Sequence, residues 1–232
     1  MTYEEMVASL KLEVVLSDAM VGQLKKYAAL LKEWNEKFNL TAITEESEVV
    51  EKHFYDCLIP AKTLKISGKT LADLGTGAGF PGLVWAIAFP DCKVTLVEAT
   101  GKKCTFLNEV ITQCGLKNAV VINKRCEEMK EREAFDIVTA RALAPMGILL
   151  EISAPLTKVG GIFLAMKGSK GEEEFNKTGS EAKKLGLVLK EVKKEDLPGG
   201  EGSRQNFFFL KENKTSNCYP RPWATILKKP LL

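Results

Sequence analysis

The chain has 232 residues, of which 45% are hydrophobic and 27% charged, and its formal net charge is +3. A chain of that length suits one large domain, which buries roughly 70% of the surface exposed in the unfolded state. The longest apolar run beside a motif, residues 82–89, is too short to span a bilayer, and residues 1–12 lack the basic start and cleavage site of a signal peptide. We therefore expect a cytoplasmic protein with no membrane segment.

The cysteines and the charge distribution bear on whether the protein has a metal site, disulfide bonds or a polyanionic partner. The six cysteines form no CxxC pair, and His53 is the single histidine, so neither a zinc site nor a disulfide framework is indicated. We expect no metal. Residues 211–232 carry five basic side chains against one acid. Such a basic tail suits a polyanion such as nucleic acid and equally suits a solvated chain end, and the sequence leaves both open.

The first third of the chain is predicted to be helical. Apolar residues recur at helical spacing from Ser17, a candidate N-cap, to Lys37. A second helical stretch runs from Glu46 to Leu64. We therefore expect a helical N-terminal region, residues 1–66, packed on the domain that follows.

Short apolar strands then alternate with helical segments over residues 67–212. Strands are expected at residues 70–74, 93–98, 119–123, 135–140 and 161–166, and this alternation is typical of a parallel sheet with helices on both faces. A helix at 170–185 and two strands, 187–192 and 206–210, joined by a Leu-Pro-Gly-Gly turn, complete the domain as a hairpin. The predicted fold is α/β, a doubly wound, mostly parallel sheet of the class I methyltransferase (Rossmann-like) type, with residues 213–232 as a basic C-terminal tail.

The first strand leads directly into a glycine-rich segment that runs from Leu71 to Gly82. Glycine tolerates positive φ in a sharp strand-to-helix turn, and its missing side chain lets a ligand approach the backbone. Gly77, Gly79 and Gly82 also satisfy the GxGxxG pattern of nicotinamide and flavin nucleotide sites. The segment is therefore predicted to bind a small molecule.

Two acids favour S-adenosylmethionine as that molecule. Asp73 lies two residues before the first glycine of the segment, where methyltransferase loops carry an acid that helps to hold the methionine end of the cofactor. Glu98 ends the second strand, 19 residues after Gly79, at the spacing of a carboxylate that accepts both ribose hydroxyls. A nucleotide-dependent oxidoreductase remains the alternative, because Glu98 serves either cofactor.

A series of short motifs then runs in order through nearly the whole chain: Trp34-Asn35, Phe38-Asn-Leu-Thr-Ala-Ile43, His53-Phe-Tyr-Asp56, Asp73-Leu-Gly-Thr-Gly-Ala-Gly-Phe-Pro-Gly82, Leu96-Val-Glu98, Lys102-Lys103, Arg125-Cys-Glu127, Thr139-Ala-Arg-Ala142 and Lys167-Gly168. With these motifs the chain resembles the bacterial 16S ribosomal RNA guanine-N7 methyltransferases known as RsmG or GidB. In addition to Gly77 of the glycine-rich segment, the resemblance implies that the following residues contact the cofactor: Gly75, Phe80, Cys126, Glu127 and Arg141. Cys126 departs from the alanine usual in the family.

The implied reaction is methyl transfer to N7 of a guanine in 16S ribosomal RNA or the small subunit, by a monomer. N7 carries a free lone pair at neutral pH, so alignment for in-line attack suffices and no catalytic general base is expected. The deep major groove of an RNA helix hides N7, so the target guanine should lie in a loop. Methylation at another RNA site and a non-catalytic RNA-binding module stay open as alternatives.

Basic and polar residues of the motifs are the candidates for substrate binding. Lys102 and Lys103 begin a helix, where the macrodipole disfavours cations, and this exception indicates a ligand. His53 and Asp56 lie one helical turn apart on the face expected to cover the cofactor, although a purely structural hydrogen bond is the alternative for this pair. The predicted substrate-side residues are Lys102, Lys103, Lys167, Arg204, Arg221, Asn39, His53 and Asp56.

Overall fold

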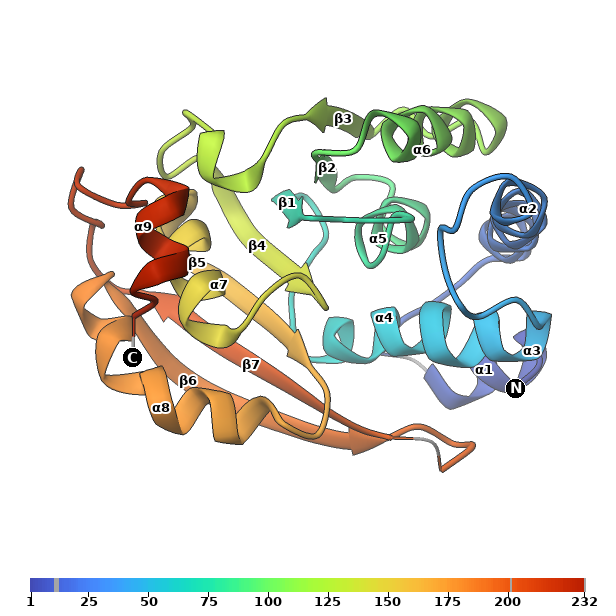
Figure 1. Cartoon of the computed structure of the whole chain (residues 1–232). Coiled ribbons are helices and arrows are strands. Elements are labelled where there is room, and N and C mark those ends of the chain that lie inside the picture. The colour runs from blue at the N-terminus through green and yellow to red at the C-terminus, as the bar shows by residue number, and fades with distance from the viewer. Residues whose placement is uncertain (11–12, 201, 232) are drawn as a thin grey trace.

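A mostly parallel sheet forms the centre of the molecule (Figure 1), and the computed structural model describes residues 1–10, 13–200 and 202–231. Within these residues the sheet has seven strands in the order β3-β2-β1-β4-β5-β7-β6. Strands β1 to β5 pair in parallel, and β7 is antiparallel to both β5 and β6. The strands are β1 (Thr70–Leu74), β2 (Lys93–Glu98), β3 (Ala119–Asn123), β4 (Phe135–Arg141), β5 (Thr157–Lys167), β6 (Leu187–Asp196) and β7 (Ser203–Lys211). The predicted fold class, including the antiparallel hairpin, is confirmed.

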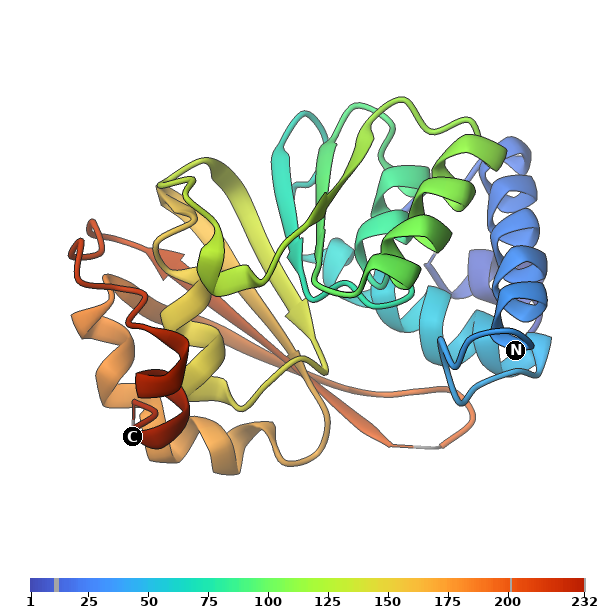
Figure 2. The same ribbon diagram turned by 45° about the horizontal axis from the view of Figure 1, so that its top comes forward.

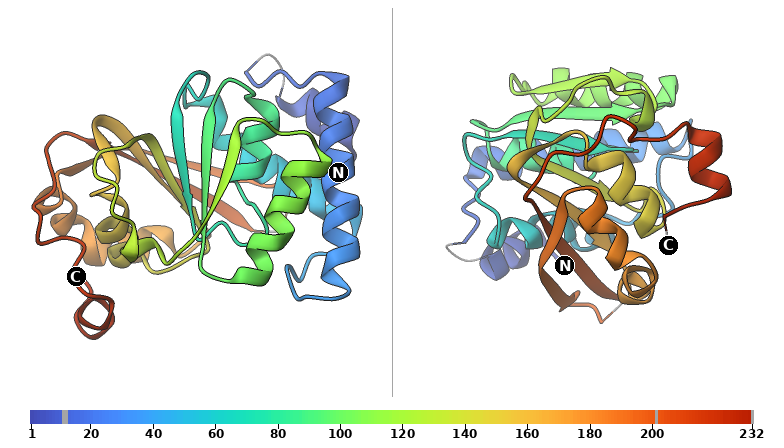
Figure 3. Two further views of the ribbon diagram at one scale, coloured as in Figure 1. Left: turned by 90° about the horizontal axis from the view of Figure 1, so that it is seen from above. Right: turned by 90° about the vertical axis from the view of Figure 1, so that its left-hand side faces the viewer.

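Helices cover both faces of this sheet (Figure 2) because successive strand residues point to opposite sides. Leu164 and Met166 of β5 enter one core with α1 (Tyr3–Leu10), α2 (Asp18–Asn35), α5 (Gly82–Ala88) and α6 (Gly101–Gln113). Phe163 and Ala165 enter a second core with α7 (Met146–Ser153), α8 (Gly171–Lys184) and α9 (Trp223–Lys228). The domain also contains a 3-10 turn, η3 (Cys126–Glu128). N-terminal and C-terminal segments thus lie on opposite sides of the molecule (Figure 3).

The N-terminal region packs on the first of these cores. Its helices are α1 (Tyr3–Leu10) and α2 (Asp18–Asn35), and α2 begins at the predicted N-cap Ser17, whose side chain accepts a hydrogen bond from the Met20 amide at 3.3 Å. A second helical run comprises α3 (Glu46–Val49), η1 (Val50–Tyr55), α4 (Asp56–Leu58) and η2 (Ile59–Lys62). The sequence predicted one helix here; the structure inserts a π-helical turn, η1, and π turns recur at functional sites.

The C-terminal tail is folded against the domain. The Arg132 guanidinium donates hydrogen bonds to the carbonyls of Tyr219, at 2.6 Å, and Thr215, at 3.1 Å. Ile226 of α9 is fully buried in the second core. The described part of the tail is therefore packed, and a loose solvated end is not what the structure shows.

Candidate active site

The glycine-rich segment forms a tight turn between β1 and α5. Gly75 and Gly77 have φ of +62° and +61°, a region in which residues with a Cβ are strained. Asp73 holds the turn from below: its Oδ2 accepts from the Gly82 amide at 2.8 Å and from the Thr76 hydroxyl. The Tyr27 hydroxyl of α2 donates to the Ala78 carbonyl of the same turn. Both ends of the turn are thus fixed by buried polar groups.

Asp73 lies within β1, as predicted, in the interior beneath the turn. Its side chain is fully buried, and it is absent from the residues that line the cavity above the turn. Burial raises its pKa to about 7 because the charged form loses hydration. Asp73 therefore shapes the backbone of the turn through Oδ2. Its Oδ1 is buried and has no hydrogen-bond partner in the described residues, and its contact with the methionine end of a cofactor stays a prediction.

A cavity of about 980 Å³ opens at the carboxyl ends of the parallel strands, where ligands bind in open α/β sheets. All predicted cofactor residues except Asp73 line it. The "loop side" of the cavity is formed by the ends of β1, β2 and β3, and is lined by Gly75, Thr76, Gly77, Ala78, Glu98, Ala99, Lys103, Lys124, Arg125, Cys126 and Glu127. The "hairpin side" lies over β4, β5 and β7, and is lined chiefly by Thr41, Lys52, His53, Asp56, Arg141, Met166, Lys167, Lys170, Arg204 and Asn206.

The loop side presents carboxylates held by the backbone. Glu98 is 6% exposed; its Oε2 accepts from the Gly77 amide at 3.1 Å and its Oε1 from the Thr100 amide at 2.8 Å. A carboxylate has about four acceptor positions, so two stay open toward the cavity. Glu127 has a buried Oε1 that accepts no hydrogen bond in the described residues and lies 3.9 Å from Arg125 Nη1, with which it forms an ion pair. Burial raises the pKa of the neighbouring Cys126 thiol to about 12, so Cys126 presents a small uncharged side chain to the cavity.

These residues fit S-adenosylmethionine. The glycine turn leaves its backbone open to a ligand, and Glu98 offers acceptors for two ribose hydroxyls. Glu127 Oε1, which accepts no hydrogen bond in the described residues, offers an acceptor for a further donor. Phe80, which is 5% exposed, adds an aromatic wall between the turn and the hairpin side. Its ring also stacks on Tyr27 at 5.4 Å, so Phe80 belongs to the core and to the cavity at once.

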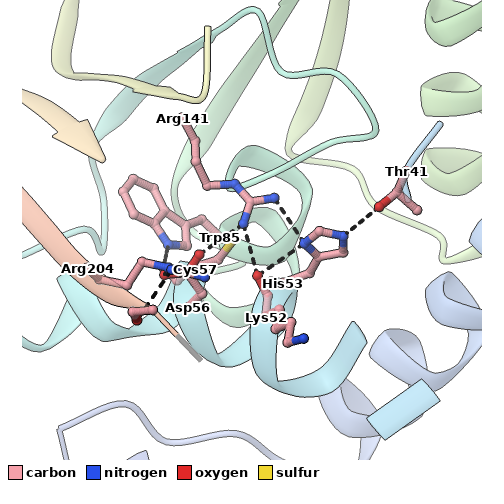
Figure 4. A network of polar contacts seen from close by, with 9 residues as sticks. Thr41, Lys52, His53, Asp56, Cys57, Trp85, Arg141 and Arg204 are labelled. Atoms are coloured by element: carbon pink, nitrogen blue, oxygen red, sulfur yellow. Dashed lines mark hydrogen bonds and ion pairs between the residues drawn. The ribbon is translucent and has the colours of Figure 1, made fainter. Parts of the chain in front are cut away.

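On the hairpin side a buried network joins segments far apart in sequence (Figure 4). The Asp56 carboxylate accepts from Arg141 Nη1 at 3.1 Å and from Arg204 Nε at 3.0 Å. Arg141 Nη1 also donates to the Lys52 carbonyl, at 3.2 Å, within the π turn. One aspartate therefore ties the N-terminal helical run to both β4 and β7.

His53 completes the network as a neutral ring. Burial, reinforced by the nearby Arg141 charge, lowers its pKa to about 3. His53 Nδ1 lies 3.2 Å from Arg141 Nη2 and 3.1 Å from the Lys52 carbonyl oxygen. Its Nε2 lies 3.0 Å from Thr41 Oγ1. The ring stacks on Phe80 with a centroid distance of 4.3 Å, and the Arg141 guanidinium lies 4.9 Å from the same ring.

The structure brings His53 and Asp56 together through Arg141. Both residues face the cavity, as the spacing predicted, but it is the arginine between them that each one contacts. Because Arg141 Nη1 and Nη2 are occupied by this network, Arg141 acts here as the link between the two sides.

Among the predicted substrate cations, Arg204 is bound to Asp56 as described above, and two more are paired with carboxylates, whereas Asn39 lies outside the cavity. Asn39 is exposed and outside the cavity lining. Lys167 pairs with Glu174 at 2.7 Å with only 9% of its side chain exposed. Arg221 pairs with the fully buried Glu151 at 2.6 Å, which fixes the tail to α7. These two charges are neutralised by carboxylates, so they hold the protein's own segments in this structure and are not free surface cations.

Other cations are free to meet an anionic ligand. Lys103 lines the cavity, and Lys102 is exposed, 5.2 Å from the centre of the Phe38 ring. Sequence reasoning missed several lining residues: Thr41, Lys124, Arg125, Lys170 and Asn206. Thr41 and Arg125 lie within the motifs and were open to discovery there, whereas Asn206 carried no signal at all.

Two structural findings bear on other classes of site. No group of three or more metal-ligating side chains gathers in the described residues. Within the same ranges, the helices are too short or too polar to cross a membrane.

Comparison with known proteins finds the same family by a family model and by individual relatives. The family model GidB, rRNA small subunit methyltransferase G, matches residues 20–201. Proteins named ribosomal RNA small subunit methyltransferase G include one from Clostridium perfringens, 44% identical over 88% of both chains, and one from Mycoplasma capricolum, 42% identical over 92% of this chain and 93% of that protein.

Solved structures with this fold are more distant in sequence. A SAM dependent methyltransferase from Aquifex aeolicus matches with a TM-score of 0.54 at 17% identity, covering 79% of this chain and 98% of that one. A 16S rRNA (adenine(1408)-N(1))-methyltransferase from Catenulisporales acidiphilia matches with a TM-score of 0.52 at 16% identity, covering 68% and 89%. At these identities the likeness shows the fold alone.

Proposed function

The chain belongs to the GidB family of rRNA small subunit methyltransferases G, and on that basis we propose that it transfers the methyl group of S-adenosylmethionine to N7 of a guanine in small-subunit (16S) ribosomal RNA. The observation that carries the proposal is the loop side of the cavity. There, the Glu98 carboxylate is fixed by the Gly77 amide of the glycine turn, and Glu127 Oε1 accepts no hydrogen bond from the described residues. This arrangement suits the ribose and base of an adenosine.

Different residues of the cavity would contact different parts of S-adenosylmethionine. Gly75 and Gly77 expose backbone to the methionine part, Glu98 takes the ribose, and Cys126 and Glu127 border the adenine. Phe80 forms the wall toward the substrate. Arg141 holds that wall in place through its contacts with His53 and Asp56.

The chemistry asks for alignment more than for proton transfer. S-adenosylmethionine supplies, when bound, a methyl group on a sulfonium sulfur. That methyl group would pass to the N7 lone pair with the sulfur leaving as a neutral thioether, so the positive charge would end on the guanine. N7 bears no proton, so the chain needs no general base. Its residues bind, orient and exclude water.

The RNA would enter on the hairpin side. Exposed cations at the cavity wall would meet phosphates: Lys170 on the hairpin side, and Lys124 and Arg125 on the adjoining loop side. Lys103 and Arg204 also line the cavity, but both are half-buried and Arg204 is bound to Asp56. The target guanine must leave any helical stack to reach the cavity. Residues 1–66 supply part of the wall, residues 67–212 hold the cofactor, and the tail 213–232 adds Trp223 at the rim. We place the enzyme in the cytoplasm, acting as a monomer on ribosomal RNA or the small subunit.

The test uses small-subunit RNA from cells that lack the enzyme. Purified protein and S-adenosylmethionine labelled in its methyl group should transfer label to this RNA, and mild reduction followed by aniline should then cleave the RNA at one N7-methylguanine. Label without aniline cleavage would support methylation at another atom. Binding of NAD without binding of S-adenosylmethionine would instead support an oxidoreductase, and transfer of no label at all would contradict the proposal.

A further inference from the structure

A buried polar atom without a hydrogen bond marks a place where a ligand can supply the missing partner. Among the described residues, such atoms occur on five side chains, and those that line the cavity are Glu127 and Asn206. Glu127 belongs to the loop side and to the proposed cofactor contacts. Asn206 is 2% exposed, and its Nδ2 has no partner in the described residues. Nothing in the cofactor site uses Asn206, which lies on the hairpin side.

The sheet register places Asn206 beside the network around Asp56. Arg141 of β4 pairs with Met166 of β5, and Met166 pairs with Asn206 of β7. Register partners on neighbouring strands point to the same face of a sheet, so Arg141, Met166 and Asn206 share one face. Arg204 points to that face too, because it lies two residues before Asn206 on the same strand. One wall of the cavity therefore carries three hydrogen-bond donors around Met166.

Two of these donors are already engaged. Arg141 donates to Asp56 and the Lys52 carbonyl and contacts His53, and Arg204 donates to Asp56. The amide of Asn206 keeps its N–H groups for a ligand. We propose that Asn206 Nδ2 donates a hydrogen bond to O6 of the target guanine and thereby selects guanine over adenine; this inference rests on the function proposed above.

The chemistry of the purine edge supports this role. N7 and O6 lie side by side on the same edge of guanine, and both are acceptors, whereas adenine carries a donor, N6–H₂, in place of O6. A base that presents N7 for methylation thus also presents the group at C6 to the neighbouring wall. Guanine would satisfy the Asn206 amide. Adenine would set two donors against each other and leave the buried amide unpaired, which is how sites built on hydrogen bonds reject an analogue.

An uncharged donor also suits the course of the reaction. Transfer moves a positive charge onto the guanine ring, and a free guanidinium at O6 would oppose that charge. The carboxylate of Asp56 partly neutralises Arg141 and Arg204, and the neutral Asn206 amide is left to make the contact. The wall can therefore read O6 without repelling the methylated base.

A double-substitution cycle tests the contact. Wild-type enzyme first identifies the methylated guanine in small-subunit RNA, and RNA is then prepared with guanine or 2-aminopurine at that position. 2-Aminopurine keeps N7 and the 2-amino group but has hydrogen in place of O6. Single-turnover methyl transfer is measured for wild type and Asn206→Ala on both RNAs, together with the affinity for S-adenosylmethionine.

We expect Asn206→Ala to lower the rate on guanine by roughly tenfold to a hundredfold, with unchanged affinity for S-adenosylmethionine. We expect little further loss when the same variant meets 2-aminopurine, because the contact is already missing. Asn206→Asp, which keeps the size but replaces the donor by an acceptor, should lose at least as much on guanine and serves if the alanine variant does not fold. Thr139→Val is the matched control, since the Thr139 hydroxyl is also buried and unpaired but does not line the cavity; it should discriminate as wild type does.

An equal loss by Asn206→Ala on both RNAs, or no loss on guanine, would overturn the assignment while the methyltransferase function stands. A wild-type enzyme that transfers no methyl group to the unsubstituted RNA would instead defeat the function on which the assignment rests.

Discussion

The two sides of the cavity are built in different ways. On the loop side the key bond, from the Gly77 amide to Glu98, joins residues 21 positions apart within one strand-helix-strand unit. On the hairpin side Arg204 and Asp56 are 148 positions apart, and Arg141 and Asp56 are 85 apart. Most of the loop side therefore forms once neighbouring strands pair, and α2 adds the bond from Tyr27 to the turn. The hairpin side forms only when the N-terminal helices and the C-terminal hairpin have both docked, so it should be the more sensitive of the two to substitution.

The buried acids of the two sides also differ. Asp73, under the loop side, is held by a hydroxyl and an amide, and burial raises its pKa to about 7. Asp56, on the hairpin side, is bound by two guanidinium groups. The loop side thus relies on neutral hydrogen-bond donors, and the hairpin side on buried charge pairs.

Replacement of Arg141 should have the largest effect, because this residue links the two sides. Arg141→Ala removes a partner of Asp56, of His53 and of the Lys52 carbonyl, and breaking a buried pair costs about 3 kcal/mol or more. Urea unfolding should show that loss, and methyl transfer should fall at least a hundredfold. Arg141→Lys, which keeps the charge but not the three directed contacts, should recover only part of the stability. Wild-type stability in the alanine variant would contradict the link.

Acid should weaken the hairpin side through His53. The pKa of its folded form is lowered to about 3, from about 6.5 in the unfolded chain, so the unfolded state binds the proton first as the pH falls. The stability contributed by neutral His53 is complete above pH 6.5 and is lost toward pH 3, by at most about 1.4 kcal/mol per pH unit. Urea unfolding at pH 7, 6 and 5 should show a flatter profile for His53→Gln. Parallel profiles for the two proteins would speak against a buried neutral ring.

The loop side should respond to pH in the opposite sense, over a slightly smaller shift. Asp73 has its pKa raised from 3.8 to about 7, so the folded state holds the proton between these values. Its stability contribution is complete below pH 4 and is lost as the pH rises toward 7. Asp73→Asn should remove this component, while the same pH series leaves the His53 component in place. If Asp73→Asn loses more stability relative to wild type at pH 7 than at pH 5, the sign is wrong.

The smallest effect is expected at the exposed lysines beside the loop side. Replacing both Lys102 and Lys103 by Glu should weaken binding to small-subunit RNA several-fold. The slope of log affinity against log salt concentration should fall by the equivalent of about one or two phosphate contacts. Folding and S-adenosylmethionine affinity should not change, because Lys102 is exposed and Lys103 only half-buried. An unchanged salt slope would show that these lysines are merely solvated.

The contrast between the sides also explains what the sequence could predict. The strands, the glycine turn and the Glu98 spacing follow from local pattern, and the structure agrees with them to within a few residues, apart from β5 and the hairpin strands, which run longer. Partners distant in sequence leave no such pattern. That Asp56 holds Arg204, that Lys167 pairs with Glu174, and that Asn206 is left unpaired in the wall all depend on how the hairpin docks. The π turn and the packed tail were hidden for the same reason.

The most direct test of the two-sided site is a pair of calorimetric titrations with S-adenosylmethionine, each followed by single-turnover methyl transfer to small-subunit RNA. Glu98→Gln removes a ribose acceptor on the loop side and should weaken cofactor binding at least tenfold. Arg204→Gln changes the hairpin side and should leave cofactor affinity within about twofold while transfer to RNA falls about tenfold or more. Equal cofactor affinity in both variants, or a loss confined to Arg204→Gln, would contradict the assignment of the cofactor to the loop side.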